Sequence, residues 1–138
     1  MLAGFIALLV PNFMQVRIKS RDMRRKSDLK AIQKALELYK QGQATPIYPT
    51  PNNTSPPSLN SCGVLTSGGS EYMKVIPQDP LAQCPTVTNA YYYATPDNYT
   101  YILCACLENP NDTEQQGAVT CAGAAACAAG KYYKLTEP

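Results

Sequence analysis

The chain has 138 residues, with 12 basic and 10 acidic side chains, six cysteines and no histidine. This length allows one long helix and one small domain, whose modest core needs extra stabilisation such as disulfides. Without histidine the commonest general base and most zinc or nucleophile-activation schemes are lost, and no phosphate loop or activated nucleophile is present, so we predict a protein that is not an enzyme and has no cofactor or metal.

The first 41 residues predict one long helix, with an apolar half over 1–14 and an amphipathic half over 15–41. Met1 to Val10 is an unbroken run of apolar or small residues. Such a run is too short to cross a bilayer, which needs about 20 residues, and it lacks the basic start and the cleavage site of a signal peptide. We expect it to be the second half of a longer hydrophobic helix, and we expect Pro11 to kink the helix or to start a new segment.

The amphipathic half should pack on the rest of the chain through one apolar stripe. The residues of that stripe recur at spacings of three and four: Leu29, Ile32, Leu36 and Tyr39. Three further residues are expected to widen it: Ala31, Ala35 and Leu38. The charged residues Lys26, Asp28, Lys34, Glu37 and Lys40 are expected to line the solvated side. Gly42 is a plausible C-cap.

A basic cluster lies between residues 17 and 30. It contains seven basic residues and two acidic ones: Arg17, Lys19, Arg21, Arg24, Arg25, Lys26 and Lys30, with Asp22 and Asp28. Such a cluster is by default a solvated face of the helix. It contains no tyrosine or tryptophan to stack on bases, so it does not indicate direct nucleic-acid binding.

The remainder, 42–138, predicts one globular domain. Residues 43–61 are rich in proline and predict a surface loop, and Ser70–Ile76 predicts one short helix or strand turn. Ala90–Ala94 and Tyr99–Leu107 predict an antiparallel hairpin, followed by a last short strand at Lys131–Leu135. In the second strand of the hairpin, alternation places five residues on one face: Tyr99, Tyr101, Leu103, Ala105 and Leu107. The fold class is therefore α+β, with the long helix packed on a small antiparallel sheet.

The six cysteines allow 15 pairings, and the sequence does not choose among them. Cys104 and Cys106 point the same way from one strand, so each should pair outside it, with Cys121 and Cys127 as the nearest candidates. That leaves Cys62 with Cys84. A metal site at the four later cysteines is the weaker alternative, because the usual spacings and any histidine are lacking. Disulfides imply an oxidising compartment, which places the basic cluster outside a membrane, against the positive-inside bias.

These features together resemble a type IV pilin or a related type II secretion pseudopilin. The most similar stretch is ALLVPNFMQVRIKSRDMRRKSDLKAIQKALELYK, with a helix proline followed by Asn12 and Phe13 and the pattern from Arg24 to Tyr39. The motifs IPQDP and YYYATPDNYTYILCACLE are similar to pilin globular domains in layout. The family's cleavage-site glycine, first phenylalanine and pairing glutamate have no counterpart before Met1. We expect roughly 11 mature residues to be missing, which would restore the span of about 20 that a bilayer requires.

The resemblance implies a major pilin, a structural subunit of an extracellular, cell-surface type IV pilus that supports adhesion, motility or DNA uptake. Its filament core would be formed by helix residues Leu2, Phe5, Ile6, Leu8, Leu9, Val10, Pro11 and Phe13. The implied partners are copies of the same chain in a helical filament, the inner-membrane pilus assembly machinery, and the inner membrane before assembly. Nucleic acid would be contacted only through the assembled filament. The basic cluster could pair with acidic surfaces of neighbouring subunits.

Two alternatives remain open. The first is a pseudopilin of a type II secretion or competence system, for which Asn111, Asp112 and Glu114 offer oxygen ligands to calcium. The second, from a different class, is a membrane-anchored extracellular binding domain. Three disulfides and a proline-rich loop suit durable display better than catalysis.

Overall fold

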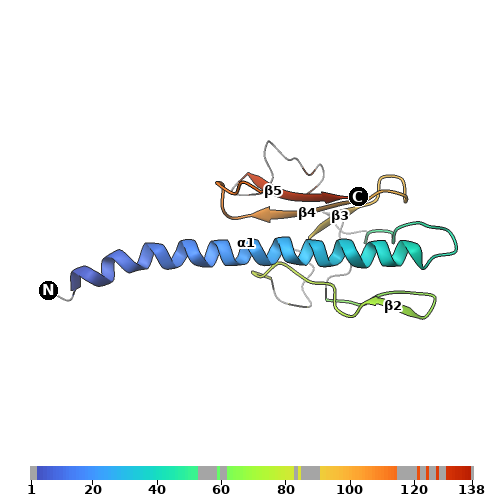
Figure 1. The fold of residues 1–138 in the computed structure, drawn as a ribbon, viewed down its shortest axis with the longest axis horizontal. Helices are drawn as coiled ribbons and strands as arrows, with labels where there is room; N and C mark the ends of the chain where they lie inside the picture. The colour runs from blue at the N-terminus through green and yellow to red at the C-terminus, as the bar shows by residue number, and fades with distance from the viewer. Residues whose placement is uncertain are drawn as a thin grey trace.

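The computed structural model describes residues 3–52, 59, 62–82, 84, 91–114, 121, 124, 127 and 130–137, with side chains described from residue 13 onward. One helix, α1 (Ala3–Gln41), is followed by five strands: β1 (Leu65–Ser67), β2 (Ser70–Met73), β3 (Tyr92–Ala94), β4 (Ile102–Leu107) and β5 (Lys131–Thr136). The helix lies between a β1–β2 hairpin and a three-stranded antiparallel sheet of order β3-β4-β5 (Figure 1). The structure thus confirms an α+β fold with one N-terminal helix packed on small antiparallel sheets.

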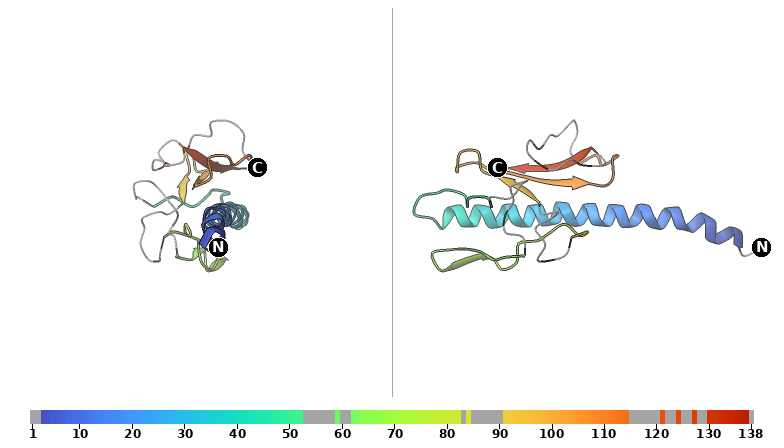
Figure 2. Two further views of the ribbon diagram at one scale, coloured as in Figure 1. Left: turned by 90° about the vertical axis from the view of Figure 1, so that its left-hand side faces the viewer. Right: turned by 180° about the vertical axis from the view of Figure 1, so that it is seen from behind.

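Helix α1 is much longer than the domain that covers it. Its C-terminal half is enclosed by the strands, whereas its N-terminal part extends well beyond them (Figures 1 and 2). The helix continues through Pro11, so of the two outcomes expected there, a kink or a new segment, the second does not occur. A proline removes only one backbone donor and can be accommodated by bending, and the ribbon bends over its first turns (Figure 1). Among the described residues, no helix combines the length and hydropathy of a membrane span.

The main core forms where α1 meets both layers. Leu29, Ile32, Ala35 and Leu36 are buried there, and Tyr39 packs at its edge. The expectation that Ala31 and Leu38 widen this stripe was wrong, because both are exposed. They lie with Ser27 and Lys34 at spacings of four, three and four, on a stripe of the helix that neither the sheet nor the hairpin covers.

The three-stranded sheet presents its two faces to different surroundings. Leu103, Ala105 and Leu107 of β4 belong to the main core, while Cys104 packs with Tyr92 on the opposite face. The hairpin expected around residues 90–107 is observed, with Ala94 opposite Ile102 in the register. Tyr99 was expected to share one strand face with Leu103 and Ala105, but it lies in the turn before β4 and is exposed.

The β1–β2 hairpin was not predicted, since Ser70–Ile76 was expected to form one short helix or strand turn. Gly68 and Gly69 connect the two strands with φ angles of 56° and 82°. Two residues with positive φ form the tight turn that matches strand twist, and glycine adopts them without strain. Tyr72 of β2 then contacts Tyr39 of α1, with ring centroids 5.3 Å apart.

Three disulfides use all six cysteines. The pairs are Cys62–Cys84, Cys104–Cys121 and Cys106–Cys127, with Cα separations of 5.9, 6.4 and 5.4 Å. Cys104 and Cys106 each pair outside β4, as their common orientation predicted. The alternative of a metal site at the four later cysteines is excluded, because disulfide sulfurs are not available as thiolate ligands.

Candidate assembly surface

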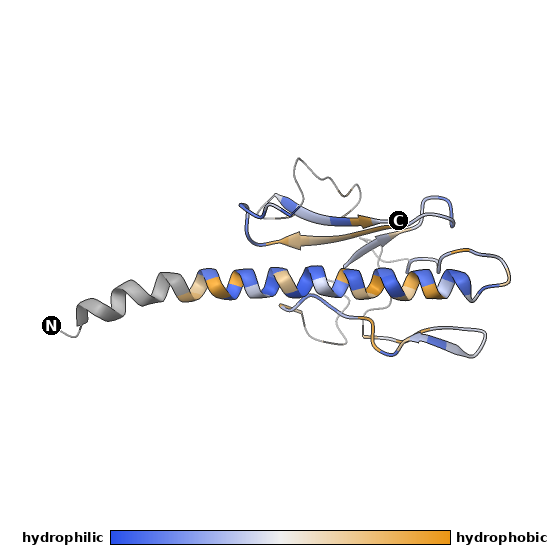
Figure 3. Ribbon diagram, viewed as in Figure 1, coloured by the Kyte–Doolittle hydropathy of each residue, from blue (hydrophilic) through white to orange (hydrophobic). Residues whose placement is uncertain are grey.

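The part of α1 that extends beyond the domain is the candidate functional surface among the described residues. We call residues 3–20 the projecting arm. Phe13, Met14 and Val16 on this arm are largely exposed, and Figure 3 shows hydrophobic residues at the start of the coloured part of α1. Isolated apolar side chains on a surface are ordinary, but a contiguous apolar stretch indicates a binding surface.

Most of the residues predicted to form a filament core lie farther along the same arm. The side chains of Phe5, Ile6, Leu8, Leu9, Val10 and Pro11 lie outside the described residues, as does the whole of Leu2. The backbone of residues 3–12 is helical, so the arm extends the helix into the apolar part of the sequence. Phe13 is the predicted core residue whose side chain is described, and it is exposed.

A buried arginine anchors the base of the arm to the domain. Arg25 donates from Nε to Asp79 Oδ2 at 2.6 Å and from Nη2 to Asp79 Oδ1 at 3.0 Å, a two-point contact with the loop after β2. Its Nη1 donates to Asp22 at 2.7 Å and to Glu108 at 2.6 Å. The side chain is only 3% exposed, so three carboxylates surround one buried guanidinium. Burial alone would lower the pKa of Arg25, but these hydrogen bonds raise it, and the group stays charged.

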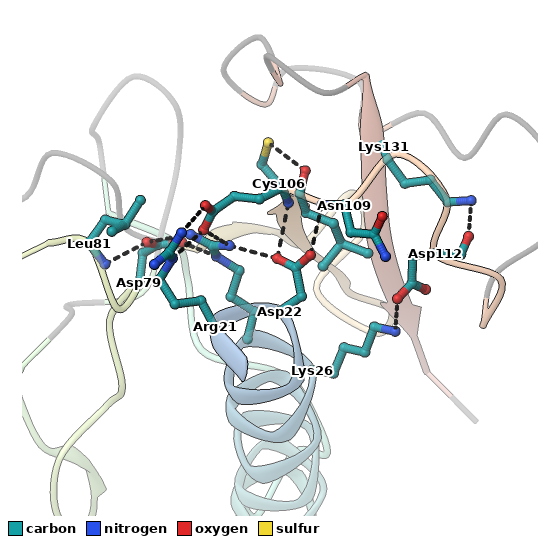
Figure 4. A network of polar contacts seen from close by, with 12 residues as sticks. Arg21, Asp22, Lys26, Asp79, Leu81, Cys106, Asn109, Asp112 and Lys131 are labelled. Atoms are coloured by element: carbon teal, nitrogen blue, oxygen red, sulfur yellow. Dashed lines mark hydrogen bonds and ion pairs between the residues drawn. The ribbon is translucent and has the colours of Figure 1, made fainter. Parts of the chain in front are cut away.

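Asp22 connects the same cluster to the strand layer. It is buried, and its two carboxylate oxygens accept hydrogen bonds from the backbone N–H groups of Glu108 and Asn109 at 3.0 and 2.9 Å. These two groups directly follow β4. Figure 4 shows Arg21, Asp22 and Asp79 close together at this level of the helix. We call the set of Arg21, Asp22, Arg25, Asp79 and Glu108 the arm-base network.

Glu108 completes the arm-base network from the domain side. Arg21 Nε donates to it at 2.7 Å, and Arg25 donates to the same oxygen. The hydrogen bond from Arg21, followed by the bond and charge of Arg25, lowers the pKa of Glu108 to about 2 against the opposing effect of burial. Glu108 is therefore ionised at neutral pH, and the arm is joined to the domain by charge-assisted bonds from two successive turns of α1.

Lys26, the residue after Arg25, forms a second anchor. Its Nζ contacts Asp112 at 2.6 Å and Glu114 at 2.8 Å, and it lies 5.5 Å from the centre of the Tyr133 ring. Lys30 adds a contact with Glu114 at 3.2 Å. The carboxylates considered above as calcium ligands are thus paired with lysine ammonium groups, which opposes binding of a divalent cation.

Arg25 and Lys26 of the basic cluster are buried and Arg21 is half-buried, so for these three residues the interpretation as a solvated face was wrong, whereas the other four basic residues are exposed as expected. Arg21, Arg25, Lys26 and Lys30 each form an ion pair with an acidic residue of the domain. The expectation that Lys26 lies on the solvated side fails for the same reason. The domain thus pairs four of the seven basic residues, and Arg17, Lys19 and Arg24 remain exposed outside these contacts.

The C-terminal end of α1 is also anchored by polar contacts that were expected to be solvated. Tyr48 donates to Glu37 at 2.9 Å, and the Lys40 ammonium lies 4.5 Å from the Tyr48 ring centre and contacts Glu137. Asp28, nearer the middle of the helix, accepts a hydrogen bond from Tyr91 at 2.8 Å, and burial raises its pKa. Of the charges placed on the solvated side, Lys34 is exposed as expected.

The sequence contained no local signal for these anchors. Arg25 and Asp79 are 54 residues apart, and Arg21 and Glu108 are 87 residues apart. Periodicity identifies a helix face but not which distant carboxylate meets it. An excess of acidic residues in the domain, opposite an excess of basic residues in the helix, was the nearest available indication.

The site is thus a projecting helix with Phe13, Met14 and Val16 exposed, joined to the domain at its base by ion pairs around the buried Arg25. Comparisons with protein-family models, with curated proteins and with solved structures found no match. The function must therefore be argued from the arm, the network at its base and the chemistry of their residues.

Proposed function

We propose that this protein is a pilin-like structural subunit, the major subunit of an extracellular type IV pilus that assembles through its projecting arm. The observation that carries the proposal is the arm itself, a helix that leaves its domain with Phe13, Met14 and Val16 exposed and continues into an apolar sequence. The pilin resemblance of the sequence from Ala7 to Lys40 supports the same assignment.

The arm needs a partner outside its own domain. At a rise of about 1.5 Å per residue, residues 3–20 extend for about 27 Å. Exposing the apolar side chains of this segment to water costs free energy that burial against other copies, or in lipid, recovers. A helical bundle of many such arms is the simplest way for one kind of subunit to bury all of them.

The arm-base network suits this role because it fixes the direction of the arm. In a filament every domain must stand in the same orientation around a common core, and a hinge at the base would make that orientation variable. Buried charge-assisted bonds from Arg21, Asp22 and Arg25 oppose such a hinge. The three disulfides add stability to a domain displayed outside the cell.

The pairing of Asp112 and Glu114 with Lys26 makes the calcium-binding form of the pseudopilin alternative less favourable. A membrane-anchored binding domain would use the same arm without assembling. Under the pilin proposal the subunit is stored in the inner membrane, is passed to inner-membrane assembly machinery and ends in a cell-surface filament. Adhesion, motility or DNA uptake would be uses of that filament.

A pair of matched variants tests the proposal. Val16→Glu places a charge on the arm, and Val75→Glu makes the same change after β2, where the side chain is similarly exposed (63% and 57%). Cells that produce each variant are sheared, and the released fraction is examined by negative-stain electron microscopy and mass spectrometry. We expect V16E to abolish filaments and V75E to retain them. Equal filament yield from both variants would contradict the proposal. So would a released fraction in which V75E and the unsubstituted protein both occur only as dispersed monomers.

A further inference from the structure

The projecting arm carries two basic side chains that differ from the rest of the basic cluster. Arg17 and Lys19 are exposed, and neither has an ion-pair partner in the part of the chain that the structure describes. Of the basic residues that follow, Arg21 and Arg25 are bonded to the domain, and Arg24 lies 3.9 Å from Asp28 of the same helix. Two cations therefore remain free at the junction between the apolar arm and the globular domain.

A second copy of this chain offers these cations little. Most acidic side chains are already used within the chain in ion pairs: Asp22, Asp28, Asp79, Glu108, Asp112, Glu114 and Glu137. Two more are satisfied by hydrogen bonds, Glu37 with Tyr48 and Asp97 with the Tyr99–Thr100 turn. Among the described acidic residues, Glu71 on the β1–β2 hairpin is the one without such an ion pair or hydrogen bond. The expected pairing of the basic cluster with acidic surfaces of neighbouring subunits thus has few carboxylates available.

We propose that Arg17 and Lys19 bind the phosphate headgroups of anionic phospholipids while the subunit is held in a membrane. The geometry supports this partner. The two residues are about 3 Å apart along the helix axis, so a helix that stands in a bilayer presents both at one depth, on different sides. The side chains that precede them, Phe13, Met14 and Val16, are apolar, and long basic side chains reach the interface from the end of such a segment.

The inference deepens the proposed function by naming the lipid class that retains the stored subunit, and its membrane state rests on that function. It also explains why these two cations lie outside the arm-base network. Their contact with lipid must end when the arm enters a filament, so they are not held by the domain. Each basic residue near an anionic surface strengthens binding about five-fold, so the pair is expected to contribute about 25-fold.

Partition of the full chain between vesicles tests the inference. The detergent-solubilised protein is mixed with phosphatidylcholine vesicles and with vesicles that also contain phosphatidylglycerol, and flotation measures the protein bound to each. We expect the unsubstituted chain to prefer the anionic vesicles about 25-fold at low salt, and less at high salt. The double variant R17Q/K19Q should lose this preference while binding phosphatidylcholine vesicles as before.

The control is K34Q/K74Q, which removes the same charge from two other exposed lysines that form no ion pair within the described residues. It should keep the preference. An R17Q/K19Q variant that still prefers anionic vesicles would overturn the inference. Retention of duplex DNA is measured in parallel, and an R17Q/K19Q variant that loses DNA retention while its vesicle binding is unchanged would also overturn it. Filament yield is scored separately. Filaments without an anionic preference refute only the lipid contact, and an anionic preference without filaments refutes only the proposed function.

Discussion

Arg25 of the helix and Asp79 of the loop after β2 form a two-point ion pair, with nitrogen–oxygen distances of 2.6 and 3.0 Å. The same guanidinium reaches Asp22 and Glu108, so one buried cation joins the helix, the hairpin side of the domain and the end of β4. The pair lies where the projecting arm begins. The direction of the arm is therefore set by electrostatic contacts more than by apolar packing at this level of the helix.

Replacement of Arg25 tests how much the domain depends on this cation. Arg25→Met leaves three carboxylates close together with Arg21 as their remaining cation, and removal of one partner from a buried pair costs about 3–5 kcal/mol. We expect chemical denaturation of the oxidised chain to show a loss of that size. Lys34→Met on the exposed stripe of the same helix should change the free energy of unfolding by less than about 0.5 kcal/mol. Equal stability of the two variants would show that the network is not structural.

Acid should weaken the arm-base network through Glu108. The pKa of this carboxyl is lowered from 4.5 to about 2 in the folded chain, so its contribution is complete above about pH 4.5 and is lost as the pH falls toward 2. The contribution is on the order of 2 kcal/mol once partial exposure is considered. Glu108→Gln should flatten the fall in unfolding free energy across this range. Asp28 acts in the opposite direction because its pKa is raised, so the comparison is made between E108Q and the unsubstituted chain. Parallel pH profiles would contradict the assignment.

The disulfide pairing can be checked directly. Digestion under non-reducing conditions, followed by mass spectrometry, should yield linked peptides for Cys62–Cys84, Cys104–Cys121 and Cys106–Cys127. Because Cys106 and Cys127 are 21 residues apart, the double variant C106S/C127S should lose about 3 kcal/mol of stability. A Cys104–Cys127 peptide from the native protein would refute the observed pairing.

Gly42 is required by its neighbour rather than by its backbone angle. A Cβ atom at this position would lie 2.1 Å from the Tyr72 hydroxyl, where β2 approaches the end of α1. We expect Gly42→Ala to lower stability by about 1–3 kcal/mol, since the ring must shift. In the double variant with Tyr72→Leu, the added cost of Gly42→Ala should be much smaller. Simple additivity of the two substitutions would show that the contact is not responsible.

Local patterns predicted the elements that depend on local chemistry. A spacing of three and four residues reveals the helix stripe of Leu29, Ile32 and Leu36. A spacing of two residues reveals the alternation of β4, and both spacings are visible in the sequence. The β1–β2 hairpin was missed although Gly68-Gly69 is a recognised two-residue turn signal, because the flanking strands are only three and four residues long.

The basic cluster could not be interpreted correctly from the sequence, for a different reason. Its charge is locally obvious, but Arg25 and Lys26 are buried by carboxylates from loops more than 50 residues away. Similar reasoning applies to Leu38 and Ala31, which have the right spacing for a core and lie where no strand covers the helix. The arm itself was predicted from its composition.

We propose that the arm forms the core of a filament. Electron cryo-microscopy of the sheared cell-surface fraction, with mass spectrometry of the same sample, tests it most directly. We predict thin filaments whose core is filled by helices that match residues 3–39, with the disulfide-bonded domain on the outside. An abundant protein in that fraction that occurs only as dispersed monomers, or filaments in which this helix lies outside the core, would contradict the account.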